Sequence, residues 1–214
     1  MKKIILAHLA IVIFLFGCSD KTIDQINYGT LKDGVYTNSY FNMKISSPKS
    51  WTWQNSEALE AQAKSGVDLI AGDDANLKAT FDLARKKTLN LFSLFEYAIG
   101  SKVSYNPNIS CAAEKVTHIP SIKTGSDYFY HMKKFLGSGR IKVDFPEESH
   151  TELLSGVTVD VMPATIRIGN LSVHQKYYAV KIKDYILLVV MNFTTKAEEK
   201  KLLGIMQKLV FNKV

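Results

Sequence analysis

The run from Tyr185 to Phe193 is apolar at every position except Asn192. A strand with one solvated face alternates apolar and polar residues, so this continuous run predicts a central strand that is covered on both faces. The segment before it does alternate, with Tyr178, Val180 and Ile182 on one parity, which predicts a neighbouring strand with one buried face. We therefore expect a sheet with packed layers on both of its sides.

A helix is predicted directly after this run. Thr195 and Glu198 match a capping box, in which each of the two side chains accepts a hydrogen bond from the other residue's backbone N–H. Apolar residues then recur at helical spacing from Leu202 to Val210. Similar patterns predict strands over 43–46, 77–83, 140–145 and 159–168, and helices over 57–64, 93–100 and 127–136. Ser93 and Glu96 match another capping box at the start of the helix over 93–100. Pro163 interrupts the alternation of its strand, which predicts a bulge or an edge position there, and the whole pattern is that of one α+β domain.

Composition and charge narrow the class of protein. The chain has 214 residues, of which 46% are hydrophobic and 22% charged, as in ordinary globular domains. Two cysteines are too few for a disulfide scaffold or a cysteine-rich zinc module. The formal net charge is +7, but the arginines are confined to the scattered positions Arg85, Arg140 and Arg167. Nucleic-acid interfaces depend on clustered basic side chains and arginine forks, so we expect a solvated lysine-rich surface and no nucleic-acid partner.

The N-terminus has the organisation of an export signal. Met1 is followed by Lys2 and Lys3, and the stretch from Ile4 to Phe16 is apolar except for His8. A helix that crosses a membrane needs roughly 20 apolar residues, so this stretch is too short to span but fits the apolar core of a secretory signal. Residues 1–17 are thus predicted to be a signal peptide.

The segment Leu15-Phe16-Gly17-Cys18 resembles the lipobox of bacterial lipoprotein signals, in which a small residue precedes an acceptor cysteine. The resemblance implies cleavage between Gly17 and Cys18 and lipidation of the Cys18 sulfur, and several acyl chains make a stable membrane anchor. Ser19 after the cysteine implies, by the same resemblance, the outer membrane facing the periplasm in a Gram-negative host, and the outer face of the cytoplasmic membrane otherwise. The alternative is an ordinary cleaved signal whose Cys18 later forms a disulfide.

Residues 18–33 are polar and lack a helical or alternating period, which predicts a flexible tether between the lipid and the domain. The folded domain is then predicted over residues 34–214. Its middle region, at about 104–150, is the part whose pattern is hardest to interpret.

The pattern Tyr36-x-Asn38-x-x-Phe41-x-Met43-x-Ile45-x-x-Pro48-x-x-Trp51 resembles the opening of the PsbP-like family. The end of the chain fits as well, with an aromatic strand at 177–178, the buried strand and a capped terminal helix. The resemblance implies a PsbP-like sandwich, mainly an antiparallel sheet flanked by helices, with a middle region at about 104–150 that is longer than the family's usual core. It also implies a non-enzymatic fold that binds other proteins or serves an assembly, and it transfers no active site because the matched residues are structural in that family.

Candidate chemistry in the mature sequence is sparse. His118, His131, His150 and His174 lack the spacings of a preformed zinc site, and Cys111 is most simply a buried, inert thiol. We therefore expect neither catalytic residues nor a metal site. The candidates for a binding surface are the aromatic residues Trp53, Tyr128 and Tyr130, although an aromatic cluster at helical spacing is also what core packing produces.

These observations favour a non-catalytic, membrane-anchored envelope lipoprotein that binds an envelope protein or serves as an accessory of an envelope complex. The alternative hypothesis is a small-ligand carrier, whose cavity would hold an apolar or aromatic molecule and would be lined by Trp53 and tyrosines. Neither hypothesis requires a cofactor.

Overall fold

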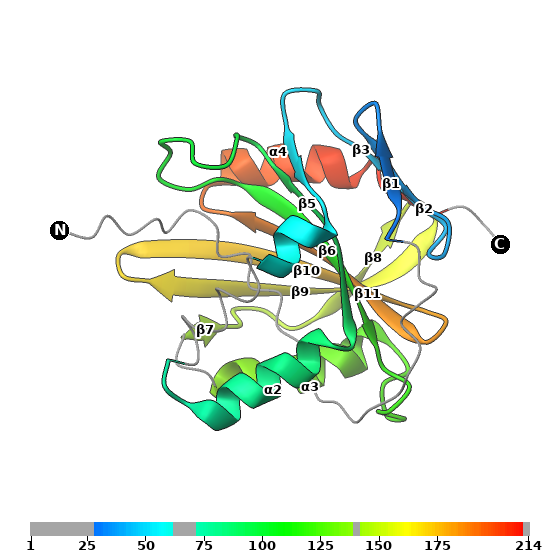
Figure 1. Cartoon of the computed structure of the whole chain (residues 1–214), viewed down its shortest axis with the longest axis vertical. Coiled ribbons are helices and arrows are strands. Elements are labelled where there is room, and N and C mark those ends of the chain that lie inside the picture. Colours follow the sequence, from blue (N-terminus) through cyan, green and yellow to red (C-terminus); the bar gives the residue numbers. More distant parts are fainter. Residues whose placement is uncertain (1–27, 62–71, 139–141, 212–214) are drawn as a thin grey trace.

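The computed structural model describes residues 28–61, 72–138 and 142–211 and contains two antiparallel sheets (Figure 1). The smaller sheet has the strand order β1 (Thr30–Lys32), β2 (Val35–Asn38), β3 (Met43–Ser46), β12 (Val210–Phe211). The larger sheet has the order β4 (Thr52–Gln54), β5 (Thr88–Phe95), β6 (Asn108–Lys115), β11 (Tyr185–Phe193), β10 (Leu171–Ile182), β9 (Val157–Ile168), β7 (Val143–Asp144), and β8 (His150–Leu154) also pairs with β9. The helices are α2 (Ala75–Arg85), α3 (Gly125–Ser138) and α4 (Lys196–Met206), and residues 56–61 are also helical.

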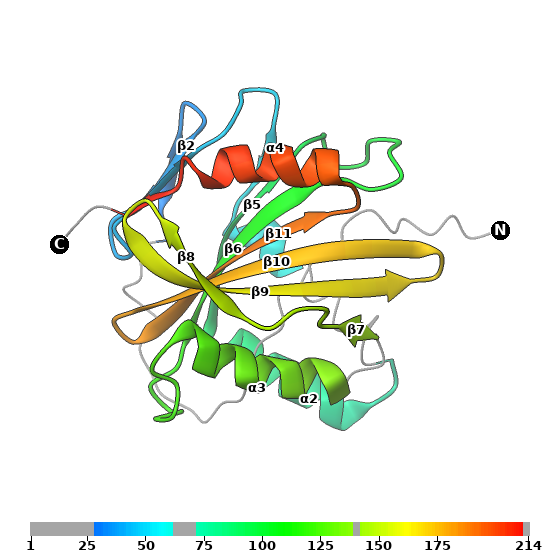
Figure 2. The ribbon, with the colours of Figure 1, turned by 180° about the vertical axis from the view of Figure 1, so that it is seen from behind.

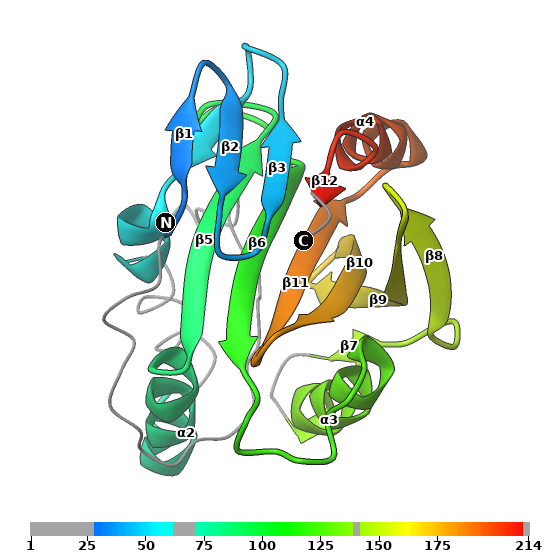
Figure 3. The ribbon, with the colours of Figure 1, turned by 90° about the vertical axis from the view of Figure 1, so that its right-hand side faces the viewer.

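The larger sheet is covered on both faces (Figure 3). On one face, the smaller sheet and α4 enclose what we call the inter-sheet core, which includes Tyr36, Ile45 and Phe92. On the other face, α3 packs on β9 and β10 around what we call the α3 core, which includes Tyr128 and Ile186. Seen from behind, α4 and α3 lie on opposite sides of the strands (Figure 2). The sheet with two packed faces that the sequence predicts is thus confirmed.

β11 is the strand predicted from the apolar run, and every one of its residues is buried. Its side chains alternate between the two cores: Leu187 and Val189 belong to the inter-sheet core, and Leu188 and Val190 to the α3 core. A strand in this position has no solvated face, which explains why its sequence shows no alternation.

The capping box predicted for the last helix is confirmed in α4. Thr195 Oγ1 accepts a hydrogen bond from the Glu198 N–H at 3.2 Å, and Glu198 Oε2 accepts one from the Thr195 N–H at 3.0 Å. The helix then turns its buried residues Leu202, Ile205 and Met206 toward the inter-sheet core. Val210, predicted to continue this stripe, belongs instead to β12.

β9 explains the change of pattern at Pro163 without a bulge. Its register with β10 is continuous from Asp160 to Ile168, with Pro163 opposite Lys176. Val161 faces the inter-sheet core, whereas Ile166 faces the α3 core, so the two ends of one regular strand bury opposite faces. On its other side β9 pairs with β8 up to Val161 and with β7 from Thr165. Pro163 lies between these two partners, so the predicted edge position is confirmed and the bulge is not.

Two predicted elements are wrong. The strand expected over 77–83 is helical and belongs to α2, where the Lys78 N–H donates to the Asp74 carbonyl at 3.0 Å and the Thr80 hydroxyl donates to the Asn76 carbonyl at 2.9 Å. Alanine, leucine and lysine are good helix formers, and a short apolar alternation does not separate helix from strand.

The helix expected over 93–100 is instead the end of β5 and a loop. The Ser93 hydroxyl is 2.7 Å from that of Ser110 on β6, and Glu96 forms an ion pair with Lys201 of α4. Both residues of the apparent capping box are therefore engaged by tertiary partners. The strand expected over 140–145 is limited to β7 in the described residues.

The N-terminal boundary of the folded part lies earlier than predicted. Residues 30–32, assigned to the tether, form β1 and pair with β2, with Leu31 opposite Tyr36. The predicted signal peptide, Cys18 and residues 19–27 of the predicted tether lie outside the described residues. Within the described ranges, no helix has both the length and the apolar character needed to cross a membrane.

Candidate functional site

The two sheets part at one side of the sandwich, where each ends in a short outer strand. β1 is the outer strand of the smaller sheet, and β4 is the outer strand of the larger one. At the opposite edge of the smaller sheet, the Ser155 hydroxyl donates to the Leu209 carbonyl and links the β8–β9 turn to the residue before β12. A hydrogen bond therefore joins the two sheets at the β12 edge of the smaller sheet, and the sheets separate at the edge formed by β1 and β4.

A cavity of about 400 Å³ lies at the open side, and we call it the Trp53 cavity. Its lining consists of Tyr28, Gly29, Leu31, Tyr36, Trp53, Gln54, Asn55, Ser56, Ala58, Leu91 and Phe92. Tyr36 and Phe92 are buried and belong to the inter-sheet core, whereas Tyr28 and Leu31 are 39% and 48% exposed. The cavity thus leads from solvent into the core, and its volume falls in the range of small-molecule sites.

The strand registers place the apolar side chains around this cavity. Leu31 lies opposite Tyr36 in the smaller sheet, and Trp53 lies opposite Leu94, a residue of the inter-sheet core, in the larger sheet. Leu31 and Trp53 therefore point into the space between the sheets. The Trp53 ring centroid is 5.2 Å from that of Phe92 and 6.2 Å from that of Tyr36, so the rings form one aromatic wall.

The polar tips of this wall are paired within the protein. Trp53 Nε1 donates to Ser47 Oγ at 2.9 Å, and the Tyr36 hydroxyl donates to the Tyr28 carbonyl at 2.6 Å. Burial raises the pKa of Tyr36, so its hydroxyl stays neutral. No lining residue carries a charged side chain. The aromatic wall therefore offers carbon surface and is suited to an apolar group.

A second hollow, of about 420 Å³, lies between β9, β10 and the start of α4, and we call it the histidine cleft. It brings together His150 and His174, which lie on strands to either side of β9. Its other lining residues are Pro146, Glu147, Pro163, Ala164, Thr165, Gln175, Lys176, Phe193, Thr194, Thr195, Lys196 and Glu199.

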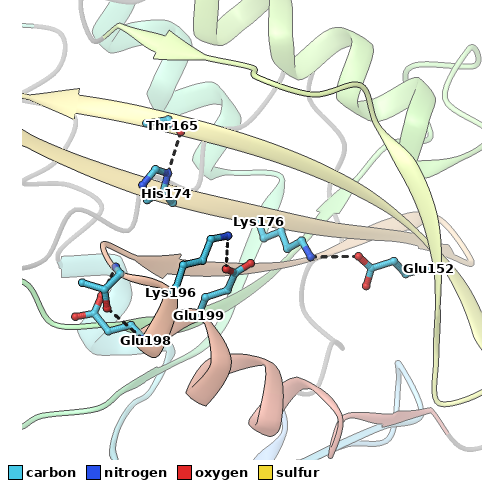
Figure 4. A network of polar contacts seen from close by, with 8 residues as sticks. Glu152, Thr165, His174, Lys176, Lys196, Glu198 and Glu199 are labelled. Atoms are coloured by element: carbon cyan, nitrogen blue, oxygen red, sulfur yellow. Dashed lines mark hydrogen bonds and ion pairs between the residues drawn. The ribbon is translucent and has the colours of Figure 1, made fainter.

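Acidic partners balance the cations of the histidine cleft (Figure 4). Lys176 Nζ is 3.3 Å from Glu152 Oε1, and His150 Nε2 is 3.2 Å from the same oxygen. Lys196 Nζ is 2.8 Å from Glu199 Oε2 within α4. Among the described residues, no group of three or more His, Cys, Asp or Glu side chains lies close enough to hold a metal ion. Each of the two lysines that line the cleft therefore has a carboxylate partner.

The structure separates the three predicted surface residues. Trp53 lines the cavity, as the ligand-carrier hypothesis expected. Tyr128 is 0% exposed and its hydroxyl donates to Glu114 Oε2 at 2.7 Å, so its prediction as a surface residue is wrong. Tyr130 is 59% exposed, but it lies on α3, which covers the opposite face of the larger sheet from Trp53. One surface shared by all three residues is therefore not formed.

The structure tests the prediction made for one of the two cysteines, Cys111, and not the one made for Cys18. Cys18 and the cleavage position at Gly17 lie outside the described residues, so lipidation stays a prediction. Cys111 is buried on β6, and burial raises the pKa of its thiol, which agrees with the inert thiol expected from the sequence.

Sequence reasoning missed most of the cavity lining. Tyr28 and Leu31 were assigned to the tether, because β1 is too short to show a period. Tyr36 appeared only as a structural residue of the family-like motif and Phe92 was not singled out, since nothing local shows that the core opens beside them. A cavity between the outer strands of two sheets depends on pairing across the whole chain, which no short motif encodes.

No family model matches the chain, and no curated protein matches its sequence. Solved structures are similar in fold. The cyanobacterial PsbP protein CyanoP from Synechocystis sp. PCC 6803 has a TM-score of 0.50 at 8% identity, over 83% of this chain and 91% of CyanoP. LpqN of Mycobacterium tuberculosis, which is involved in cell envelope biogenesis, has a TM-score of 0.42 at 8% identity, over 80% and 83% of the two chains. PA94 of Pseudomonas aeruginosa, a protein of unknown function, has a TM-score of 0.43 at 10% identity, over 57% and 83%.

The similarity to CyanoP bears on the fold alone, because the identity is low. It agrees with the α+β, PsbP-like sandwich that the sequence predicts, and that prediction is confirmed.

Proposed function

We propose that this chain is a non-catalytic, membrane-anchored envelope lipoprotein whose folded domain binds a small apolar ligand in the Trp53 cavity. The observation that carries the proposal is the uncharged, aromatic lining of that cavity. A ligand that covers the exposed side chains of Tyr28 and Leu31 at the opening would gain binding free energy, since burial of an apolar side chain contributes about 1.5–3 kcal/mol. The geometry therefore favours the ligand-carrier hypothesis over a purely accessory role.

The anchor is supported by the sequence from Leu15 to Cys18. The proposed location is the outer membrane facing the periplasm in a Gram-negative host, and otherwise the outer face of the cytoplasmic membrane. The intact mass of the protein extracted from membranes, with N-terminal fragment sequencing, tests this part. A terminal Cys18 that carries acyl mass is expected, and an unmodified terminus would contradict the anchor.

A non-catalytic role is supported by the environment of the reactive side chains in the described residues. Cys111 is enclosed in the core, His150 lies beside the Glu152 carboxylate, and His174 lies beside the Thr165 hydroxyl. His174 Nδ1 is 3.1 Å from Thr165 Oγ1, and both of these side chains are on the surface. This arrangement suits polar packing along the cleft.

Binding in the Trp53 cavity is tested with N-phenyl-1-naphthylamine, an uncharged aromatic probe that fluoresces in apolar sites. The full chain should bind it saturably. Ala58→Phe places a ring inside the cavity from a half-buried helical position and should abolish this binding. Leu153→Ser removes an apolar side chain that is 75% exposed elsewhere and should leave binding unchanged. Equal binding by both variants would contradict the proposal.

A protein partner is a second candidate function, and one observation favours it. Leu153 is 75% exposed on β8, which pairs with β9 and forms an outer strand of the larger sheet. Outer strands with exposed apolar side chains are ready sites for protein association. A photo-crosslinking amino acid at Leu153 should capture one reproducible envelope protein in whole cells, whereas the same group at Tyr130 on α3 should not.

A further inference from the structure

The lining of the Trp53 cavity restricts the chemistry of its ligand. The indole N–H of Trp53 and the hydroxyl of Tyr36 already have protein partners, at 2.9 Å and 2.6 Å. A ligand that needs directional hydrogen bonds deep in the cavity would find these groups occupied, and breaking such bonds is costly. A hydrocarbon makes no such demand, so the deep end of the cavity suits a saturated or unsaturated carbon chain.

The polar lining residues are consecutive in the chain. Gln54 ends β4, Asn55 follows it, and Ser56 begins the helical segment 56–61. Asn55 Oδ1 already accepts from the Ala58 N–H at 3.1 Å, which fixes the start of this helical segment. An occupant with a hydrocarbon body and a polar end therefore matches the cavity better than a wholly apolar molecule does.

The position of the cavity along the chain indicates where such a molecule comes from. Tyr28, the first described residue, lines the cavity. On the proposed anchoring at Cys18, on which this inference rests, the intervening chain can reach at most roughly 36 Å. The opening of the cavity is thus held close to a membrane surface, where acyl chains are the abundant hydrocarbon.

We propose that the Trp53 cavity binds one acyl chain of a phospholipid drawn from the membrane to which the protein is anchored. Trp53 and Phe92 pack on the chain, Leu31 and Tyr28 cover it at the opening, and the polar end of the lipid lies toward Asn55 and Ser56. The exposed side chains of Tyr28 and Leu31 are then buried by the ligand instead of facing water.

Quenching of Trp53 fluorescence tests this directly. The full-length protein with Trp51→Phe, which leaves Trp53 as its one tryptophan, is placed in phosphatidylcholine vesicles whose acyl chains carry bromine near the chain end. Bromine quenches tryptophan only at short range, so we expect loss of Trp53 emission relative to unbrominated vesicles. The same chain with Ala58→Phe in addition keeps its distance from the membrane but has a filled cavity, and its quenching should be lost.

Three other outcomes overturn the proposal, and a fourth separates it from the proposed anchor. Equal quenching with and without Ala58→Phe would show mere proximity to the membrane, and no quenching in either would show an empty or differently filled cavity. If solvent extraction of the protein yields no phospholipid while Cys18 carries acyl mass and Trp53 is unquenched, the covalently attached chain fills the cavity instead. Cavity-dependent quenching by a chain without acyl mass at Cys18 would refute the anchor and leave the acyl-chain site standing.

Discussion

Tyr128 and Glu114 form a buried polar pair inside the α3 core. The two residues are 0% and 2% exposed, and the Tyr128 hydroxyl donates to Glu114 Oε2 at 2.7 Å. Burial, and then the nearby Glu114 carboxylate, raise the pKa of Tyr128 well above its ordinary value. The tyrosine therefore remains a neutral donor near neutral pH.

Tyr128→Phe removes this donor while keeping the ring that packs in the core. Hydrogen bonds to charged groups contribute about 1.5–3 kcal/mol, and we expect the free energy of unfolding in urea to fall by that amount. Tyr130→Phe is the matched control, because its side chain is 59% exposed, and its effect should stay within about 0.5 kcal/mol. Equal stability of the two variants would contradict the role assigned to the pair.

The difference between Tyr128 and Tyr130 was present in the sequence, but only as helical spacing. Tyr128, Met132 and Leu136 are four residues apart and all are buried, while Tyr130 lies off this stripe. If the segment is a helix, the stripe shows that Tyr128 is buried in the core and that Tyr130 is exposed. The role of Trp53 could not be read in this way, because a strand pattern assigns a face and does not show whether the neighbouring sheet covers it.

At the scale of the element, the stability of α4 depends on the capping hydrogen bonds of its first turn. The hydroxyl of Thr195 satisfies the Glu198 N–H, and Glu198 in turn accepts from the N–H groups of Thr194 and Thr195 at 2.7 Å and 3.0 Å. Thr195→Ala removes one side of the box and should lower the free energy of unfolding by about 1 kcal/mol, as measured by urea denaturation. Thr195→Ser keeps the oxygen and should retain most of the stability. A loss of equal size in both variants would show that the methyl group, and not the cap, matters.

Elements were predictable where local pattern and tertiary environment agree. β11, α3 and α4 carry long periods or caps, and each was predicted at nearly its observed position. The apparent capping box at Ser93 and Glu96 failed because a two-residue match recurs by chance, and the buried strand β5 around it decides the structure. α2 failed for the opposite reason, since its short apolar alternation fits a strand as well as a helix.

For the molecule as a whole, the buried tyrosines predict loss of stability in alkali. Burial raises the pKa of Tyr36, Tyr105, Tyr177 and Tyr178, and it raises that of Tyr185 to about 12. In the unfolded chain a tyrosine ionises near pH 10, so above about pH 10 protons are lost from the unfolded state first. Each such group then lowers the free energy of unfolding by up to about 1.4 kcal/mol per pH unit, until its folded pKa is reached.

We therefore expect urea midpoints to fall steeply above about pH 10, with a shallower decline beginning near pH 8.5 from the buried Cys111 thiol, whose pKa burial also raises. Tyrosine absorbance should show most phenolate appearing together with unfolding, and not before it. Midpoints that stay constant through this range, or phenolate formation by all of the tyrosines while the protein is still folded, would contradict the burial of these hydroxyls.

Attachment to the membrane is the property of the whole molecule on which the proposed function depends. Cys18→Ala removes the sulfur that accepts the lipid, so the protein should lose its acyl mass and occur either as a longer precursor or as a released protein. Cys111→Ala is the matched control, because it removes the other cysteine from the core and leaves the N-terminus intact. Fractions should be compared in high salt, since a lysine-rich chain of formal charge +7 also binds anionic headgroups electrostatically, and salt screens that attraction. If the Cys18→Ala protein remains in the membrane fraction in high salt at its mature size, a lipid on Cys18 is not what attaches the protein to the membrane. The argument that the acyl chain in the Trp53 cavity comes from the anchoring membrane would then fail.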